Sequence, residues 1–259
     1  MPVPPVPSPA VLQAPAHWQA VDLISDLHLQ VSDRPTLEAW QAHLTHTRAD
    51  AVLILGDLFE VWVGDDAIDH DPFWQAAVQT LAHTARHKTV GLLRGNRDFL
   101  IGPDFFARTG LMELADPTLL IFAGVRTLLS HGDALCLGDV DYQRFRQLSR
   151  TPEWQSQFLG QSLSERLAMA ERMRAQSEAH NRGMSAFADA DPGLSQDWVR
   201  HTGASHLVHG HTHRPADHAH AWGLRQVLTD WDLLAQPPRC GILRLHADGR
   251  RERLAPETT

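Results

Sequence analysis

Five segments of this chain share one pattern, in which a short apolar run ends directly in side chains that can bind metal ions. The clearest run covers residues 51–55, whose length and β-branched content predict a buried parallel strand, and Gly56 and Asp57 follow it at once. In open α/β sheets, ligands collect at the carboxyl ends of strands, because the loops there leave a crevice that helices do not fill. We therefore predict that Asp57 lies at the centre of a site at this edge.

Four other predicted strands end in the same way. Their donors are Asp26 and His28 after residues 20–25, Asn96 after 89–93, His131 after 125–129, and His211 and His213 after 205–208. The D-x-H and H-x-H spacings place two side chains on one side of an extended segment, because residues i and i+2 share a face. Each pair can therefore bind a single ion.

The segments between these strands favour an α/β fold. Helical spacing over residues 36–47 links the first two strands into a βαβ unit with a right-handed crossover. Asp71 and Pro72 predict an N-cap and first turn for a helix that ends near residue 85. Residues 119–122 and 125–129 are predicted to form a hairpin, a short helix is predicted at 196–200, and strands at 224–228 and 241–245 complete the fold.

Residues 152–180 change the character of the chain. Apolar residues recur there at steps of three and four, with charged residues such as Arg166 in the other positions, so the region is predicted to be amphipathic and helical. Because it interrupts the strand–helix alternation, we interpret it as a cap inserted at about 150–190; a helix packed on the sheet is the alternative. We expect a disordered, proline-rich leader over 1–17, one domain over 18–250 and a loose tail over 251–259.

The composition excludes several classes of protein. A length of 259 residues suits one large α/β domain, and a net charge of -8 provides no overall basic footprint for nucleic acid. Two cysteines are too few for a disulfide framework or a thiolate zinc site. No apolar run is long enough for a spanning helix, and the start lacks the order of a signal peptide. We expect a cytoplasmic protein.

The donors suit two metal ions better than one. Seven oxygen and nitrogen donors exceed the needs of a single ion, whereas two ions that share Asp57 would use them all. Mixed carboxylate and imidazole ligation favours Mn, Fe or Zn over Mg or Ca. Two ions about 4 Å apart polarise a phosphoryl group and lower the pKa of a bound water, so that no nucleophilic side chain is required. The sequence therefore predicts a two-metal phosphoester hydrolase.

The series DLH, GDLFE, GNRD, SHGD and GHTH, in this order, resembles the calcineurin-like metallophosphoesterases. The resemblance implies their fold, a β-sandwich core flanked by helices, here with an inserted helical cap. It also implies two sets of ligands, with His209 outside both: Asp26, His28, Asp57 and His213 for one ion, and Asp57, Asn96, His131 and His211 for the other.

Four longer pieces, GDLFEVWVGDD, GNRDFLIG, HGDALC and HGHTHRP, resemble the UDP-2,3-diacylglucosamine diphosphatases of lipid A biosynthesis. That family uses manganese to hydrolyse a pyrophosphate, giving UMP and 2,3-diacylglucosamine 1-phosphate at the cytoplasmic face of the inner membrane. The resemblance thus implies two Mn²⁺ ions, a UDP-linked diacylated glucosamine substrate, peripheral contact with membrane lipid, and neither nucleic acid nor an obligate protein partner. The catalytic residues it implies are Asp57, Asn96, Arg97 and His211, and the other substrate-binding residues are Asp139, Tyr142, Ser177 and Asn181, with Arg97 contacting phosphate.

Some positions depart from that narrower family. Residues 158–166 are more polar than its cap, Met184 stands where a lysine is expected, and 229–232 replace a glycine-containing segment. These departures leave the metal ligands intact and bear on lipid specificity. The alternatives are another calcineurin-like hydrolase that acts on a nucleotide or phosphomonoester, and a non-catalytic scaffold, which should have lost ligands. The net charge disfavours a nuclease.

Overall fold

Strand β3 (Ala51–Leu55) lies in the middle of a six-stranded sheet, and all five of its residues are buried. It pairs in parallel with β2 (Ala20–Ile24) and β4 (Thr89–Leu93). β5 (Met112–Leu114) extends the sheet on one side, and β11 (Ile242–His246) and β12 (Arg251–Leu254) extend it on the other. A central parallel strand is covered on both faces, so every position needs an apolar side chain.

The computed structural model describes residues 6–183 and 188–256, and their side chains except those of 176–183.

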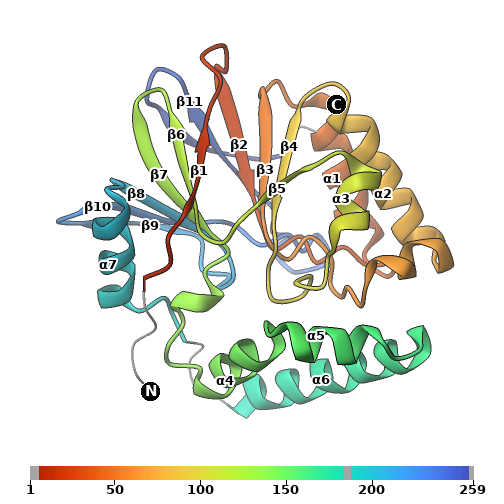
Figure 1. Ribbon diagram of the computed structural model, residues 1–259. Coiled ribbons are helices and arrows are strands. Elements are labelled where there is room, and N and C mark those ends of the chain that lie inside the picture. Colours follow the sequence, from red (N-terminus) through yellow and green to blue (C-terminus); the bar gives the residue numbers. More distant parts are fainter. Residues whose placement is uncertain (1–5, 184–187, 257–259) are drawn as a thin grey trace.

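A second six-stranded sheet packs against the first. The two sheets lie face to face (Figure 1). Leu23 and Leu53 of the first sheet and Leu129 and Val208 of the second belong to one buried cluster between them. The predicted sandwich is confirmed. The strands of the second sheet, in spatial order, are β1 (Ala10–Gln13), β6 (Thr118–Phe122), β7 (Val125–Ser130), β8 (His206–His209), β10 (Gly223–Val227) and β9 (Ala216–His220).

Helices flank the two sheets on their outer faces (Figure 1). The helix predicted from Asp71 and Pro72 begins there, because the side chain of Asp71 accepts the Phe73 N–H at 2.8 Å. The helix predicted over 36–47 begins two residues earlier, because the side chain of Asp33 accepts the Thr36 N–H at 3.1 Å and caps it. The flanking helices are α1 (Arg34–His46), α2 (Pro72–Ala85) and α3 (Pro103–Thr109) on the first sheet and α7 (Pro192–Thr202) on the second, with short 3₁₀ turns η1 (Asp65–His70) and η2 (Asp133–Leu135).

Three helices, α4 (Val140–Ser149), α5 (Pro152–Leu159) and α6 (Leu163–Gly183), lie together across one end of the sandwich (Figure 1). We call them the cap. Half-buried Leu163 and Leu167 of α6 pack against the core cluster that contains Trp62, which favours the alternative of a packed helix, and the insertion of the cap stays a prediction. Arg166 is buried, which corrects its assignment to the polar face: its Nη1 donates to the carbonyl oxygen of Val63 at 2.5 Å.

Two terminal segments differ from the predicted leader and tail. Residues 10–13 form strand β1, which pairs in parallel with β6, and residues 251–254 form β12, which pairs antiparallel with β11. Each segment covers the edge of a sheet whose backbone groups would otherwise lack partners. The proline content of the leader did not prevent this, because the four residues of β1 contain no proline.

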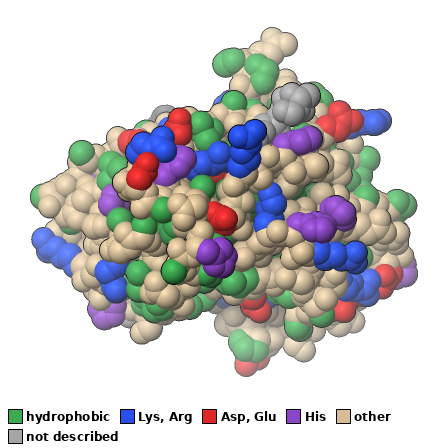
Figure 2. Space-filling model, turned by 90° about the horizontal axis from the view of Figure 1, so that it is seen from above, with side chains coloured by type: hydrophobic (Ala, Val, Ile, Leu, Met, Phe, Trp, Pro, Cys, Tyr) green, Lys and Arg blue, Asp and Glu red, His purple; other side chains and the backbone are tan. Residues whose placement is uncertain are grey.

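The end of the molecule opposite the cap carries basic, acidic and histidine side chains interspersed with one another (Figure 2). Within the described residues, no helix combines the length and the apolar character needed to cross a membrane.

Candidate metal centre

All seven predicted donors follow strands, and both sheets contribute to them. Asp26 and His28 come after β2, Asp57 after β3 and Asn96 after β4, whereas the remaining three histidines come after β7 and β8 of the other sheet. Two triads of potential ligand atoms lie within 4.8 Å of one another: Asp26, His28 and His213, and Asp26, Asp57 and His131. The loops at one end of the sandwich therefore meet in a single place.

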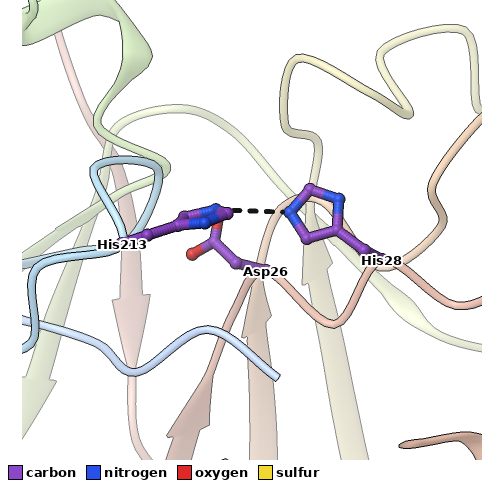
Figure 3. A group of neighbouring side chains, drawn as sticks. All are labelled: Asp26, His28 and His213. Atoms are coloured by element: carbon purple, nitrogen blue, oxygen red, sulfur yellow. Dashed lines mark hydrogen bonds and ion pairs between the residues drawn. The ribbon is translucent and has the colours of Figure 1, made fainter. Parts of the chain in front are cut away.

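The first group is Asp26, His28 and His213 (Figure 3). The Nε2 atoms of the two histidine rings lie 3.3 Å apart, and Nε2 of His213 lies 3.4 Å from Oδ1 of Asp26. Nε2 of His28 also lies 3.8 Å from Oδ2 of Asp57. Two ring nitrogens that face each other beside two carboxylates form a donor set that suits a divalent transition metal.

The second group centres on Asn96. Its Oδ1 lies 2.8 Å from Nε2 of His131 and 2.8 Å from Nδ1 of His211. Nε2 of His131 is 3.6 Å from Oδ1 of Asp57, so the two oxygens of Asp57 face the two groups separately. This position suits a bridging carboxylate, although Asp26 is the residue that the two triads share, and the bridge remains a prediction.

Five of the seven donors have left-handed backbone conformations. Their φ values lie between 48° and 65°, at Asp26, His28, Asp57, His211 and His213. Such conformations cost roughly 1–3 kcal/mol each for non-glycine residues and gather at functional sites, where the surrounding structure enforces them. They also correct the expectation of extended i, i+2 pairs: the paired side chains converge because the backbone turns tightly at each donor.

The motif glycines allow the backbone to approach the carboxylates closely. A Cβ atom on Gly95 would overlap the carboxylate of Asp57, and one on Gly210 would overlap the side chains of Asp26 and Ser25. Only glycine leaves room for these contacts. The glycines of GNRD and GHTH are therefore part of the site's geometry.

A further set of oxygen atoms lies behind the histidine rings. Nδ1 of His28 is 2.8 Å from Oε2 of Glu60, and Nδ1 of His213 is 3.6 Å from Oδ2 of Asp230. Nδ1 of His131 faces the carbonyl oxygen of Leu55 at 2.9 Å. Partners of this kind set which ring nitrogen faces a metal. Glu60 and Asp230 were not predicted from the sequence; the signal for Glu60 was a second acid among the apolar residues of GDLFEVW.

The charges of the site also fit cations. Burial opposes protonation of His131, but the Asp57 and Asp26 carboxylates outweigh it and raise its pKa to about 9. Burial and the charge of Asp57 raise the pKa of Asp98 to about 6, and burial together with His131 lowers the pKa of His211 to about 4. Buried carboxylates thus lie close enough to shift one another's pKa values. Bound cations would relieve the repulsion between these negative charges.

The predicted phosphate contact, Arg97, reaches the same place. Its backbone N–H donates to Oδ1 of Asp57 at 2.8 Å, and its guanidinium Nη1 lies 3.5 Å from Oε1 of Glu60. The side chain is 28% exposed, so its guanidinium keeps access to solvent and to a ligand.

The other predicted substrate residues have mixed outcomes. The Tyr142 hydroxyl donates to Asp133, and its ring centroid lies 5.8 Å from that of His211. The side chain of Asp139 accepts the Tyr142 N–H at 3.0 Å and so caps α4, a role that we did not predict. The side chains of Ser177 and Asn181, like residue Met184, lie outside the described part of the chain.

His209 stays outside both donor groups. It is buried, and its Nδ1 lies 2.9 Å from the carbonyl oxygen of Gly210. Burial lowers the pKa of His209 to about 4. Its side chain is therefore neutral near pH 7.

Comparisons with known proteins agree with these motifs. Residues 20–215 match the model of the family "Calcineurin-like phosphoesterase". The chain is 44% identical to UDP-2,3-diacylglucosamine hydrolase of Chromobacterium violaceum, over 82% of this chain and 90% of the relative. It is 41% identical to the protein of the same name from Ralstonia nicotianae, over 92% and 94%. Among solved structures, Vps29 of Entamoeba histolytica is 14% identical with a TM-score of 0.46, over 91% of this chain and 98% of that one.

Proposed function

Because the chain belongs to the calcineurin-like phosphoesterase family, we propose that it hydrolyses the pyrophosphate of UDP-2,3-diacylglucosamine to UMP and 2,3-diacylglucosamine 1-phosphate. The observation that carries the proposal is the meeting of all seven predicted donors at one end of the sandwich, in a chain whose relatives bear that hydrolase name over most of their length. No donor position is substituted, which argues against a scaffold without activity.

The donor set supports two divalent cations, and we propose manganese. Asp26, His28, Asp57 and His213 would hold one ion, and Asp57, Asn96, His131 and His211 would hold the other. Carboxylate, amide and imidazole donors without thiolates suit this choice. Two such ions, when bound, polarise a phosphoryl group and lower the pKa of the attacking water.

Side chains of the protein would orient the phosphoryl group for the reaction. The Arg97 guanidinium would take a phosphoryl oxygen through its planar fork, which its partial exposure allows. His211 is neutral near pH 7 because its pKa is lowered to about 4, so it suits ligation better than proton donation. A phosphate is already a good leaving group, so the reaction needs no dedicated general acid.

The position of the attacked phosphorus can be tested with isotopes. We expect water to attack the uridine-side phosphorus, breaking its bond to the bridging oxygen, which leaves with the sugar 1-phosphate. Hydrolysis in oxygen-18 water, followed by mass spectrometry of both products, should place the label in UMP alone. Label in the lipid phosphate would contradict this assignment. No cleavage would favour the alternative, a calcineurin-like hydrolase of nucleotides or phosphomonoesters.

An aromatic row joins Phe99 of the Arg97 loop to three rings of the cap, which come from α4 and α5. Ring centroids of Phe99 and Trp154 are 6.0 Å apart, those of Phe145 and Trp154 are 5.9 Å apart, and Trp154 stacks on Phe158 at 5.0 Å. Phe99 is two residues from Arg97, so the row starts on the loop that carries the proposed phosphate contact. We propose that this row contacts the acyl chains.

Trp154→Ala should therefore raise KM for the diacyl substrate by about 30-fold, if the ring contacts two or three methylenes worth roughly 2 kcal/mol in total. KM for a short-chain analogue should change little, because that analogue does not reach the row. Steady-state kinetics on both substrates measures the difference. Trp222→Ala is the matched control, since Trp222 stacks on His220 in the second sheet, and it should leave both KM values unchanged. Equal increases for the two substrates would assign Trp154 to packing alone.

The cap also carries exposed apolar side chains. Leu148 of α4 is 56% exposed and Leu159 of α5 is 41% exposed. Such residues support peripheral contact with lipid, which we propose takes place at the inner face of the inner membrane.

A further inference from the structure

Glu60 lies between the first metal group and the cap, and its two carboxylate oxygens face in different directions. Oε2 is 2.8 Å from Nδ1 of His28, whereas Oε1 is 3.1 Å from Nε of Arg174 on α6 and 3.5 Å from Nη1 of Arg97. The carboxylate is only 9% exposed, so these contacts replace most of its hydration. One side chain thus contacts a metal ligand, the proposed phosphate contact and the cap.

The contact with His28 determines what that ring can offer. When Nδ1 carries the proton and faces Glu60, Nε2 is left with its lone pair, and this is the nitrogen that lies 3.3 Å from Nε2 of His213 (Figure 3). A carboxylate behind a ligating histidine fixes its tautomer and ring orientation, and makes it a better donor. Glu60 therefore affects how well the first group can bind a cation.

The contact with Arg174 joins this arrangement to α6. Two arginines of the helix, about two turns apart, reach the segment of residues 56–66 that follows β3. Arg166 donates to Oδ1 of Asp66 at 2.9 Å and to the carbonyl oxygen of Val63, while Arg174 reaches Glu60. Both arginines connect the cap to the loop that carries Asp57. Of the two carboxylates that they bind, Glu60 is the one that contacts His28 of the first metal group.

We propose that Glu60 is a positioning residue. It couples the packing of α6 against residues 56–66 to the affinity of the first group for a cation. Arg174 holds the carboxylate in place, and the carboxylate in turn holds His28 with Nε2 directed at the cation. The inference rests on the proposed function only in requiring a divalent-cation site. It does not depend on which phosphate ester is hydrolysed.

Manganese binding by the full-length protein, stripped of metal, tests the coupling without any substrate. Free Mn²⁺ is followed by electron paramagnetic resonance during a titration. Glu60→Ala should weaken one of the two binding steps by about 10–100-fold, the range found when a partner behind a ligating histidine is lost. Glu60→Gln keeps the size of the side chain and an acceptor for His28 but loses the charge that binds Arg174, so a smaller loss is expected.

Arg174→Gln is the decisive variant, because the two explanations of Arg174 predict opposite signs. If Arg174 is only a positive charge near the site, its removal should tighten cation binding. If it positions Glu60, its removal should weaken binding severalfold, and the double variant Glu60→Ala/Arg174→Gln should be no weaker than Glu60→Ala alone. Unchanged or tighter binding by Arg174→Gln would overturn the proposal.

Asp66→Asn supplies the matched control for the cap. It removes the charge that pairs with Arg166 without touching His28, so manganese affinity should stay within twofold of the unmodified protein. Melting curves followed by circular dichroism establish that each variant is folded. A loss of affinity in Asp66→Asn equal to that in Arg174→Gln would assign the effect to general loosening of the cap, against a specific role of Glu60. If the proposed hydrolysis failed, these binding curves would still stand.

Discussion

Asp57→Asn is expected to lower kcat/KM by more than 100-fold while the protein stays folded. The two oxygens of Asp57 face the two donor groups, 3.8 Å from Nε2 of His28 and 3.6 Å from Nε2 of His131, so the substitution removes a negative charge from both at once. Loss of a partner that only orients a ligand already costs about 10–100-fold, and loss of a shared ligand should exceed that range. Steady-state kinetics at saturating manganese, with metal analysis by plasma emission, measures the effect.

Two further variants make the Asp57 result interpretable. His28→Asn removes a donor from one group only, and should retain some turnover at high manganese. Asp69→Asn makes the same chemical change as Asp57→Asn at an exposed carboxylate that binds Arg108, and should leave kcat/KM unchanged. Activity that survives EDTA, in protein with fewer than one bound ion per chain, would contradict the two-metal proposal.

Arg97→Ala should lower kcat/KM by roughly 10²–10³-fold with normal metal content, as the loss of one preorganised contact to a charged transition state does. The guanidinium is held beside Glu60 at 3.5 Å yet stays 28% exposed, so it is placed at the site without being fully occupied by the protein. The kcat/KM of Arg97→Lys should lie between that of Arg97→Ala and that of the unmodified protein, because lysine keeps the charge but lacks the planar fork. Kinetics and metal analysis on the same preparations give both quantities.

Arg94→Ala is the matched control within the same loop. Nε of Arg94 donates to the carbonyl oxygen of Ile101 at 2.6 Å and its Nη1 pairs with Glu113, so its contacts lie away from the donors. This variant should lose thermal stability and keep its kcat. If Arg97→Ala lost metal together with activity, Arg97 would be a structural residue.

Much of the fold was predictable because its central strands are buried on both faces. The continuous apolar run at 51–55 and the strands on either side of it need no long-range information to be recognised, and each is where it was expected. The edges of the sheets were not predictable in this way. β1 and β12 are short, and what makes them strands is pairing with a neighbouring strand, which for β1 is β6, far away in the sequence.

The helices also separate features that local sequence predicts from features that distant residues determine. Asp71 indicates the start of α2, because an N-cap acts on backbone groups within a few residues of itself. The burial of Arg166 had no such local sign, since a helical charge pattern predicts a solvated face unless a carboxylate and a carbonyl from a distant loop approach it.

The chemistry of the donors follows from the amino-acid sequence alone. Carboxylate, amide and imidazole side chains are properties of single residues, and their positions after apolar runs are local, so the whole candidate ligand set can be named from the chain's residue order. How these donors meet depends on the tertiary structure. Left-handed turns at five of them, and the approach of two sheets, bring Asp26 beside His213, which no local spacing encodes. The same is true of Glu60, whose partners His28 and Arg174 lie on opposite sides of it in the sequence. A carboxylate interacts with the charged groups that lie within a few ångströms of it. Which groups these are depends on packing, and packing depends on the whole chain.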